Sequence, residues 1–267
     1  MNAILKYPGA KWRIAGWIIE NMPAHHSYIE PYFGSGAVFF NKNPSNIETI
    51  NDIDGEVVNF FEVVRDMPEE LAAKIYMTPY ARAVYEGVYK EPCNYTQSKL
   101  DRALRFCIKL NMSHGFRSNN SKVGWKNDVQ GRERAYAVQV SNKIPEVIME
   151  AAERLRGIQI ECRPAVDVIN RFNNSKCFIY CDPPYLLSTR RGKQYNVEMS
   201  NREHEELLNA LLLNKSKIMI SGYESDLYND ALKGWRKKTG FNLTQSLRKA
   251  KEVIWMNYDC DKQLCLF

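Results

Sequence analysis

The chain has 267 residues, 45% of them hydrophobic, and a formal net charge of +6. This length and composition allow one substantial core plus an insertion and argue against two unrelated full-sized domains. No apolar run approaches the ~18 residues of a membrane-spanning helix and no secretory signal precedes the first motif, so we expect a cytoplasmic protein. The seven cysteines include no Cys-x-x-Cys pair, which argues against a zinc site and a disulfide scaffold, and we expect no metal cofactor.

The first predicted strand, Tyr28–Glu30, leads into a glycine turn, Glu-Pro-Tyr-Phe-Gly-Ser-Gly, that ends at Gly36. Glycine allows positive φ and lets a ligand approach the backbone closely, and a helix following the turn would direct its amide groups towards that ligand. Because a single Gly-x-Gly is also common in ordinary turns, this turn alone does not identify a binding site.

The second predicted strand, Ile47–Asp52, ends in an acidic residue. An acid at this spacing after a glycine turn accepts hydrogen bonds from a ribose in doubly wound nucleotide-binding sheets. We prefer Asp52 for this role because it ends the apolar run, although Asp54 competes for it. Asp54 is better placed to cap a helix over Gly55–Arg65.

A long basic segment separates these elements from the next motif. Residues 101–143 contain nine Lys or Arg and three acids, an excess of +6 that equals the net charge of the whole chain. A charge-rich segment is often only a solvated face, but the loop His114–Lys122 interleaves an aromatic residue, turn residues, amides and cations, which favours nucleic acid. An amphipathic helix around Leu100–Leu110 is predicted to pack this insertion together.

The most informative motif, Asp182-Pro183-Pro184-Tyr185, follows the apolar run Cys177–Cys181. An apolar run that ends in a carboxylate and two prolines indicates a buried strand stopping at a rigid loop. The loop offers a carboxylate, the Pro183 carbonyl and an aromatic face, a set that suits a planar ring bearing an amino group. The alternative is a proline-terminated strand with an ordinary surface turn.

The remaining elements alternate as expected for an α/β sheet. We predict helices over Val147–Arg156 and after the capping box Ser200–Glu203, and strands over Ile158–Ile160, Lys217–Ser221 and Glu252–Tyr258.

Several short motifs in the right order are more specific than any one of them. Together, Lys6–Lys11, the Phe33–Gly36 turn, Asp52 and the Asp182–Tyr185 loop resemble the Dam-like family (D12 class, alpha-group) of DNA adenine-N6 methyltransferases, over nearly the whole chain. The resemblance implies an α/β fold, a doubly wound Rossmann-like methyltransferase sheet with an inserted, mainly helical target-recognition domain. It implies that residues 1–64 and 155–267 form the catalytic domain and that residues 65–154 form the recognition domain.

The resemblance also implies the site residues. The catalytic residues are Asp182, Pro183, Pro184 and Tyr185. S-adenosylmethionine is bound by Tyr7, Lys11, Phe33, Gly34, Ser35, Gly36, Asp52 and Asp182. Double-stranded DNA is bound by Arg117, Asn119, Asn120, Lys122, Lys126, Arg190 and Arg191, with the first three as candidate readers of bases. A mobile cationic loop explains Arg190 and Arg191 equally well. The chain departs from the family at Tyr7, where tryptophan is common, and at Ala10, where glycine is common.

The expected reaction transfers a methyl group from S-adenosylmethionine to the N6 amino group of an adenine flipped out of the duplex. Three alternatives remain: a catalytically inactive site-specific DNA-binding protein, an amine methyltransferase acting on RNA or protein, and a cytosine-C5 enzyme with Cys93 as nucleophile. The last is weak because no matching glutamate segment follows Pro92–Cys93. The amino-acid sequence does not specify the DNA target sequence or the biological role, which could be restriction-modification, regulation or viral protection. It also does not decide between a monomer and a weak dimer.

Overall fold

The computed structural model describes residues 1–90, 97–115, 117–129, 135–190, 192–243 and 249–259. The chain forms two compact units, and each is discontinuous in sequence. The helical unit comprises residues 1–10, 54–157 and 194–197, and the sheet unit comprises residues 11–53, 158–193 and 198–267. Pro92–Cys93, the candidate cytosine-C5 nucleophile segment, lies outside the described residues, as does Arg191.

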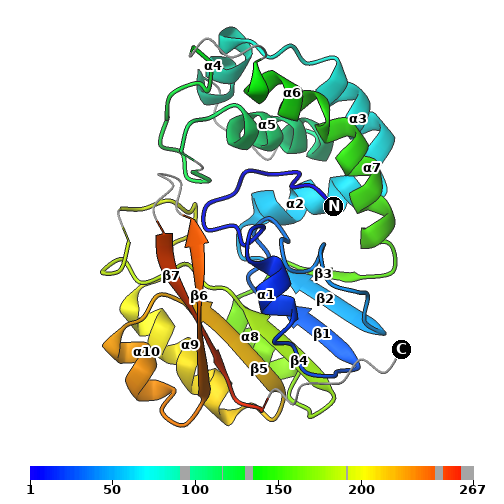
Figure 1. The fold of residues 1–267 in the computed structure, drawn as a ribbon. Coiled ribbons are helices and arrows are strands. Elements are labelled where there is room, and N and C mark those ends of the chain that lie inside the picture. The colour runs from blue at the N-terminus through cyan, green and yellow to red at the C-terminus, as the bar shows by residue number, and fades with distance from the viewer. Residues whose placement is uncertain (91–96, 116, 130–134, 191, 244–248, 260–267) are drawn as a thin grey trace. The chain divides into compact units, whose positions relative to one another are not determined.

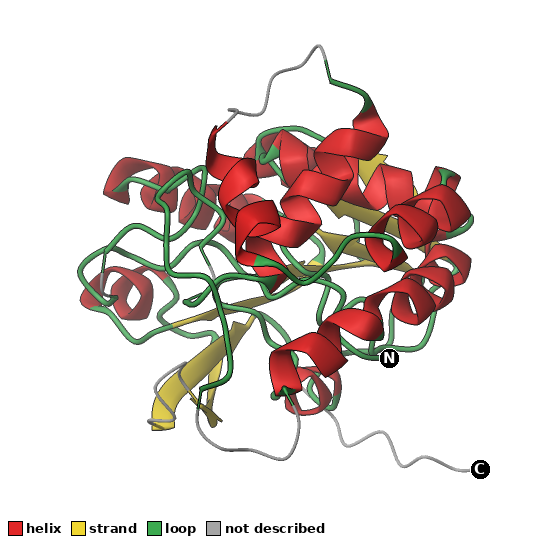
Figure 2. Cartoon of the chain, turned by 90° about the horizontal axis from the view of Figure 1, so that it is seen from above, coloured by secondary structure: helices red, strands yellow, loops and turns green. Residues whose placement is uncertain are grey.

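The sheet unit is built on seven described strands in the order β3-β2-β1-β4-β5-β7-β6 (Figure 1). They are β1 (Ser27–Glu30), β2 (Ile47–Asn51), β3 (Gln159–Glu161), β4 (Cys177–Cys181), β5 (Lys217–Gly222), β6 (Arg236–Leu243) and β7 (Lys249–Met256). The pairs from β3 to β5 are parallel, whereas β7 is antiparallel to both β5 and β6. In Figure 2 these strands, drawn in yellow, form one twisted sheet. A mixed α/β fold with a mainly parallel sheet fits a methyltransferase.

Strand β6 is a described strand that the sequence analysis did not predict. It begins Arg236-Lys237-Lys238-Thr239, without the hydrophobic alternation that marks a half-buried strand. It lies at the edge of the sheet, and among the described strands it pairs with β7 alone. Charged residues, lysine above all, are typical of edge strands, where they discourage further strand pairing.

Alternate residues of the strands face two different sets of helices. On one face, side chains from β1, β4, β5 and β7 pack against α8 (Ala165–Arg171), α9 (Asn201–Leu213) and α10 (Asp226–Ala231). The buried members on this face include Ile29, Ile179, Ile220 and Trp255, together with Leu207, Leu208 and Leu211 of α9. On the other face, Trp17 of α1 (Ala15–Ile19) covers β6, where a Cβ on Gly240 would lie 2.9 Å from its ring. Helices therefore lie against both faces of the sheet.

Helix α9 begins at the capping box predicted from the sequence. The Ser200 side chain accepts a hydrogen bond from the Glu203 backbone N–H, and the Glu203 carboxylate accepts one from the Ser200 backbone N–H. His204, in the first turn, is fully buried and hydrogen-bonded to the Tyr228 hydroxyl at 2.9 Å. This contact explains His204 as a packing residue at the end of the helix.

The helical unit contains α2 (Gly55–Asp66), α3 (Pro68–Tyr76), α4 (Arg82–Lys90), α5 (Lys99–Asn111), α6 (Tyr136–Asn142) and α7 (Ile144–Leu155). Helix α5 is the predicted amphipathic helix: Phe106, Cys107 and Ile108 are buried, and Leu100 and Leu104 are half-buried. Asp54 caps α2 by accepting from the Glu56 backbone N–H at 3.0 Å, which confirms its predicted capping role.

The two compact units are defined by packing, and the helical unit includes α2 and residues 1–10. The predicted boundaries, after residue 64 and before residue 155, instead separate residues by function: those that recognise DNA from those that catalyse the reaction. That division therefore stays a prediction. Among the described residues, no helix is long and apolar enough to cross a membrane.

Candidate active site

The Asp182–Tyr185 loop begins where β4 ends, at the carboxyl edge of the parallel part of the sheet. All five residues of β4 are buried, and β4 lies between β1 and β5. Asp182 and Tyr185 are half-buried, while Pro183 between them is buried. As predicted, a buried strand ends at this loop, at the edge where open α/β sheets bind their ligands.

Three donors converge on one oxygen of Asp182. The Lys11 ammonium lies 2.8 Å from Oδ1, the Ser221 hydroxyl donates to the same oxygen at 2.8 Å, and the Tyr185 hydroxyl lies 3.3 Å away. The second oxygen, Oδ2, accepts no hydrogen bond from the described residues, and the side chain is 19% exposed. Asp182 is therefore held through one oxygen while the other remains available to an external donor.

Glu252, on β7, joins this cluster although the sequence analysis did not identify it. Its carboxylate accepts a hydrogen bond from the Tyr185 hydroxyl and lies 3.9 Å from the Lys11 ammonium. Burial raises the pKa of Glu252 to about 7, since the attraction of Lys11 does not offset the loss of hydration and the repulsion from Asp182. The only sequence signal was an acid at the start of an apolar strand, Glu252–Tyr258.

Aromatic rings enclose the same cluster. The Tyr185 ring meets the Tyr223 ring edge to face at 4.6 Å, and the Lys11 ammonium lies 4.7 Å from the centre of the Tyr185 ring. Burial raises the pKa of the Tyr185 hydroxyl well above its ordinary value, as do the neighbouring carboxylates Asp182 and Glu252. The tyrosine therefore stays a neutral hydrogen-bond donor near neutral pH. Tyr223 and Ser221 were also missed, because single polar residues at the end of a strand carry no distinctive pattern.

The glycine turn has the backbone that the sequence predicts. Gly34 and Gly36 have φ of 51° and 66°, and a Cβ on Gly36 would lie 2.5 Å from the Phe33 ring. The Gly34 N–H donates to Asp52 Oδ2 at 2.8 Å, so the acid at the end of β2 fixes the turn after β1. Ser35 accepts from the Trp12 indole at 3.1 Å. These contacts hold a turn that requires glycine at position 36.

The prediction of a helix directly after this turn is wrong. Residues 37–41 form successive turns, with the Phe40 N–H donating to the Gly36 carbonyl at 2.9 Å. The rings of Phe33, Phe39 and Phe40 pack against one another, with centroids 5.1–5.9 Å apart. This packing draws the chain back over the turn, and the amide groups of a helix N-terminus are not available there.

The residues predicted to bind the cofactor fall in both units. Lys11, Phe33, Gly34, Ser35, Gly36, Asp52 and Asp182 belong to the sheet unit, and Tyr7 belongs to the helical unit. Within its own unit, Tyr7 is buried and its ring lies 6.0 Å from that of Tyr195. The structure thus brings Lys11 and Asp182 into contact and joins Gly34 to Asp52.

The loop predicted to read DNA is closed at its base in the helical unit. Ser113 and Trp125 pair as an antiparallel bridge, and the Lys126 N–H donates to the Met112 carbonyl at 2.7 Å. Between them, Asn120 and Lys122 are exposed, and Arg117 and Asn119 are half-buried. The Asn119 side chain accepts from the Ser121 backbone N–H at 3.1 Å, which shapes the tip of the loop.

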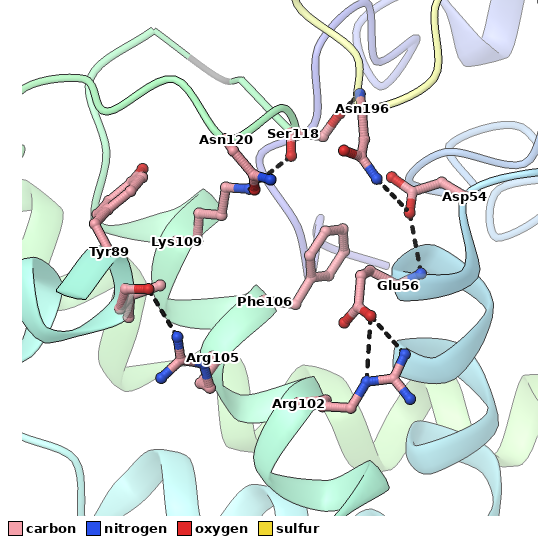
Figure 3. Close-up of a pocket in the computed structure, with 11 residues that line it drawn as sticks. Asp54, Glu56, Tyr89, Arg102, Arg105, Phe106, Lys109, Ser118, Asn120 and Asn196 are labelled. Carbon is pink, nitrogen blue, oxygen red and sulfur yellow. Dashed lines mark hydrogen bonds and ion pairs between the residues drawn. The ribbon is translucent and has the colours of Figure 1, made fainter. Parts of the chain in front are cut away.

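A cavity of about 310 Å³ lies beside this loop, within the helical unit (Figure 3). Lys109 reaches across it to the Ser118 carbonyl at 2.7 Å and to the Asn120 side chain at 3.3 Å. On another wall, Asn196 donates to Asp54 at 3.3 Å. Burial raises the pKa of Asp54 above its ordinary value.

Arg190 supports the loop that follows Tyr185. Its guanidinium donates to the carbonyls of Tyr185 and Gly192, each at 2.7 Å, and pairs with Glu198. The side chain is 7% exposed. These contacts account for Arg190 without DNA, and a contact with DNA stays a prediction for it. Arg191 lies outside the described residues.

Comparison with known proteins identifies the family. The family model described as D12 class N6 adenine-specific DNA methyltransferase matches residues 7–246. The chain is 24% identical to DNA adenine methylase of Escherichia coli (strain K12) over 279 residues, which covers 100% of this chain and 95% of the relative. It is 24% identical to the Salmonella typhimurium (strain LT2) DNA adenine methylase, covering 85% of this chain and 82% of the relative. It is 27% identical to that of Vibrio cholerae serotype O1 (strain ATCC 39541), covering 70% of this chain and 67% of the relative. The chain therefore belongs to the D12 class of N6 adenine-specific DNA methyltransferases.

Proposed function

We propose that this DNA adenine methyltransferase takes its methyl group from S-adenosylmethionine and holds the target adenine on the Asp182–Tyr185 loop. The observation that carries the proposal is the asymmetry of Asp182. Lys11, Ser221 and Tyr185 all approach Oδ1, and Oδ2 accepts no hydrogen bond from the described residues. A carboxylate fixed in this way is an acceptor with a defined direction.

The adenine amino group needs such an acceptor. Its lone pair is delocalised into the ring, so the nitrogen is a poor nucleophile. Hydrogen bonds from the two amino protons to Asp182 Oδ2 and to the Pro183 carbonyl would localise the lone pair and direct it at the incoming methyl group. Fixed acceptors of this kind stabilise the developing positive charge on nitrogen without reorganising during the reaction.

The sheet unit offers a fitting site for S-adenosylmethionine, which supplies a methyl group on a positively charged sulfur. Gly34 and Gly36 have positive φ, and the rings of Phe33 and Phe40 leave no room for a Cβ at Gly36. Asp52 fixes this turn through the Gly34 N–H. We propose that Asp52, rather than the helix-capping Asp54, also receives the ribose hydroxyls. Lys11, Phe33, Ser35 and Asp182 of the sheet unit also belong to the proposed cofactor-binding set, as does Tyr7 of the helical unit.

The adenine must leave the duplex to reach Asp182, because its amino group is stacked and paired inside double-stranded DNA. Tyr185 has an aromatic ring, and its hydroxyl is hydrogen-bonded to Glu252. Stacking of the adenine on this ring would offset part of the free-energy cost of unstacking the base. Base flipping is therefore part of the proposal.

Recognition of the DNA sequence is proposed for the helical unit. The loop between Ser113 and Trp125 exposes Asn120 and Lys122 and carries Arg117 and Asn119. Arg and Asn can make paired hydrogen bonds to guanine and adenine edges, whereas Lys122 and Lys126 suit phosphates. On this proposal, residues 65–154 act as an inserted recognition domain.

The family assignment and the intact Asp182 cluster do not favour an inactive DNA-binding protein or an RNA or protein methyltransferase. A cytoplasmic location and a monomer or weak dimer remain predictions from the sequence.

The experiment that tests the proposed function is transfer of labelled methyl from S-adenosylmethionine to unmethylated genomic DNA, with RNA and protein acceptors in parallel. Nucleoside analysis and mapping of modified positions would follow. We expect N6-methyladenine in DNA at a defined sequence, and its loss in Asp182→Ala with cofactor binding retained. Label in RNA or protein alone, or N6-methyladenine formed equally well by Asp182→Ala, would contradict the proposal.

A further inference from the structure

We propose that Glu252 is a positioning residue for methyl transfer. By accepting the hydrogen bond of the Tyr185 hydroxyl, it keeps Asp182 available to the adenine amino group. This inference rests on the proposed function of Asp182. It adds a residue from β7, far in sequence from the Asp182–Tyr185 loop, and gives that residue a role in the reaction.

The geometry sets up a competition for one proton. The Tyr185 hydroxyl lies within hydrogen-bond reach of two carboxylates, Glu252 Oε1 and, at 3.3 Å, Asp182 Oδ1. A phenol has a single proton to donate, so it can satisfy only one of them at a time. The shorter contact is with Glu252, which is 1% exposed and has little access to water as an alternative partner.

The direction of this hydrogen bond depends on the state of Glu252. When Glu252 is ionised it can only accept, and the Tyr185 hydroxyl points to it. When Glu252 is protonated, its own O–H can donate to the Tyr185 oxygen, and the Tyr185 proton then turns towards Asp182. In the second state Asp182 accepts a third protein hydrogen bond, in addition to those from Lys11 and Ser221, and is a weaker acceptor for the adenine amino group.

The groups facing Glu252 come from four places in the sheet unit. They are Lys11 before α1, Tyr180 on β4, Asp182 and Tyr185 after β4, and Tyr223 after β5. Lys11 lies 2.8 Å from Asp182 but 3.9 Å from Glu252, so one ammonium group serves two carboxylates. Burial raises the pKa of Glu252 to about 7, which puts its change of state in the working range of an enzyme. The rate of methyl transfer should be highest above that pKa, where Glu252 is ionised, and should fall as the pH drops through it.

The test is the single-turnover rate of methyl transfer on preformed complexes with S-adenosylmethionine and duplex DNA, measured from pH 5.5 to pH 9. Glu252→Gln keeps the shape of the side chain but cannot ionise. We expect its rate at pH 8.5 to be roughly tenfold to 100-fold below wild type, the size of effect that a misplaced reacting group produces. We expect the fall in rate near pH 7 to disappear in this variant, while the KM values for DNA and cofactor change little.

Two further variants make the test specific. Tyr185→Phe keeps the ring and removes the shared proton, so adding Glu252→Gln to it should change the rate by less than about threefold, a coupling that independent residues would not show. Glu224→Gln, a change of an exposed acid that pairs with Lys237 and Lys251, should retain the wild-type rate and pH profile.

The inference is overturned if Glu252→Gln keeps the wild-type rate and profile, or if its effect multiplies with that of Tyr185→Phe. Should Glu252→Gln fail to fold, as thermal unfolding would reveal, the Tyr185→Phe profile decides: an unchanged fall near pH 7 in that variant contradicts the inference. Failure of the proposed function is seen separately, as absence of N6-methyladenine from the wild-type reaction or as full activity of Asp182→Ala.

Discussion

The ammonium of Lys11 lies 2.8 Å from Asp182 Oδ1, with the two side chains only 3% and 19% exposed. Such an ion pair is costly to break, because removing one partner leaves the other charged and poorly hydrated. It also fixes the orientation of the carboxylate through Oδ1, and Oδ2 accepts no hydrogen bond from the described residues.

Replacing Lys11 by Gln should therefore impair catalysis and also lower the free energy of unfolding. Without the ammonium group, Asp182 loses its strongest donor and the Asp182–Glu252 repulsion is no longer balanced. We expect the single-turnover rate to fall about 100-fold, as expected for a disturbed near-attack geometry. Lys233→Gln, a change at an exposed lysine, is the control and should be neutral. A Lys11→Gln enzyme with the wild-type rate would remove Lys11 from the account.

Gly36→Ala should disrupt the cofactor turn. The position has φ +66°, and an added Cβ would lie 2.5 Å from Phe33 and 2.7 Å from Phe40. Backbone strain alone costs about 1–3 kcal/mol, so we expect both a lower unfolding free energy and weaker S-adenosylmethionine binding, measured by denaturant titration and calorimetry. Gly87→Ala, within α4 and with no atom within 4 Å of the new Cβ, should instead stabilise the protein by about 0.5–1 kcal/mol.

His204 should make stability depend on pH. Burial lowers its pKa from 6.5 to about 4 in the folded protein. The unfolded state therefore binds a proton first as the pH falls below 6.5, and the free energy of unfolding should drop by up to about 3 kcal/mol by pH 4. Equilibrium unfolding of His204→Gln should show a shallower fall over this range, while His26→Gln, at an exposed position, should follow wild type. Parallel curves for His204→Gln and wild type would contradict this prediction.

Variants in the loop between Ser113 and Trp125 should distinguish contacts that read the DNA sequence from contacts that bind all DNA. We expect Lys122→Gln to weaken binding to all DNA sequences alike and to reduce the slope of log affinity against log salt by about one. Arg117→Ala should instead relax discrimination at one base pair by about 1–3 kcal/mol. Binding of matched and singly substituted duplexes at several salt concentrations tests both, with Lys215→Gln as the exposed control in the sheet unit. Equal losses on every duplex for Arg117→Ala would assign it to phosphate contact.

How far the sequence predicted the fold and the site depends on whether each signal was local. The carboxylate and prolines at Asp182–Pro184 correctly predict the end of a strand, and Ser200 with Glu203 correctly predicts the start of a helix. Both signals lie within a few residues of each other in the sequence. The apolar stretch after Gly36 misled us: the packing of Phe33, Phe39 and Phe40 produced turns instead of a helix.

Glu252 and Ser221 were missed for the opposite reason. Each is a single polar residue without a distinctive local pattern, and only the pairing of β5 with β7 and of β4 with β5 brings them to Asp182. The contact of Lys11 with Asp182 likewise depends on the tertiary fold, so that only the family resemblance placed Lys11 in the site. Contacts between strands distant in sequence carry no local pattern.

The central claim is that Asp182 accepts the hydrogen bond of the target amino group, and the most direct test is single-turnover methyl transfer by Asp182→Asn. The control is Asp230→Asn, a change of an exposed acid on α10. Cofactor and DNA binding are measured on both variants. We expect Asp182→Asn to bind both ligands yet lose methyl transfer by a factor of about 100 or more, since a neutral amide replaces the charged acceptor. Transfer by Asp182→Asn at the rate of wild type and of Asp230→Asn would contradict the account.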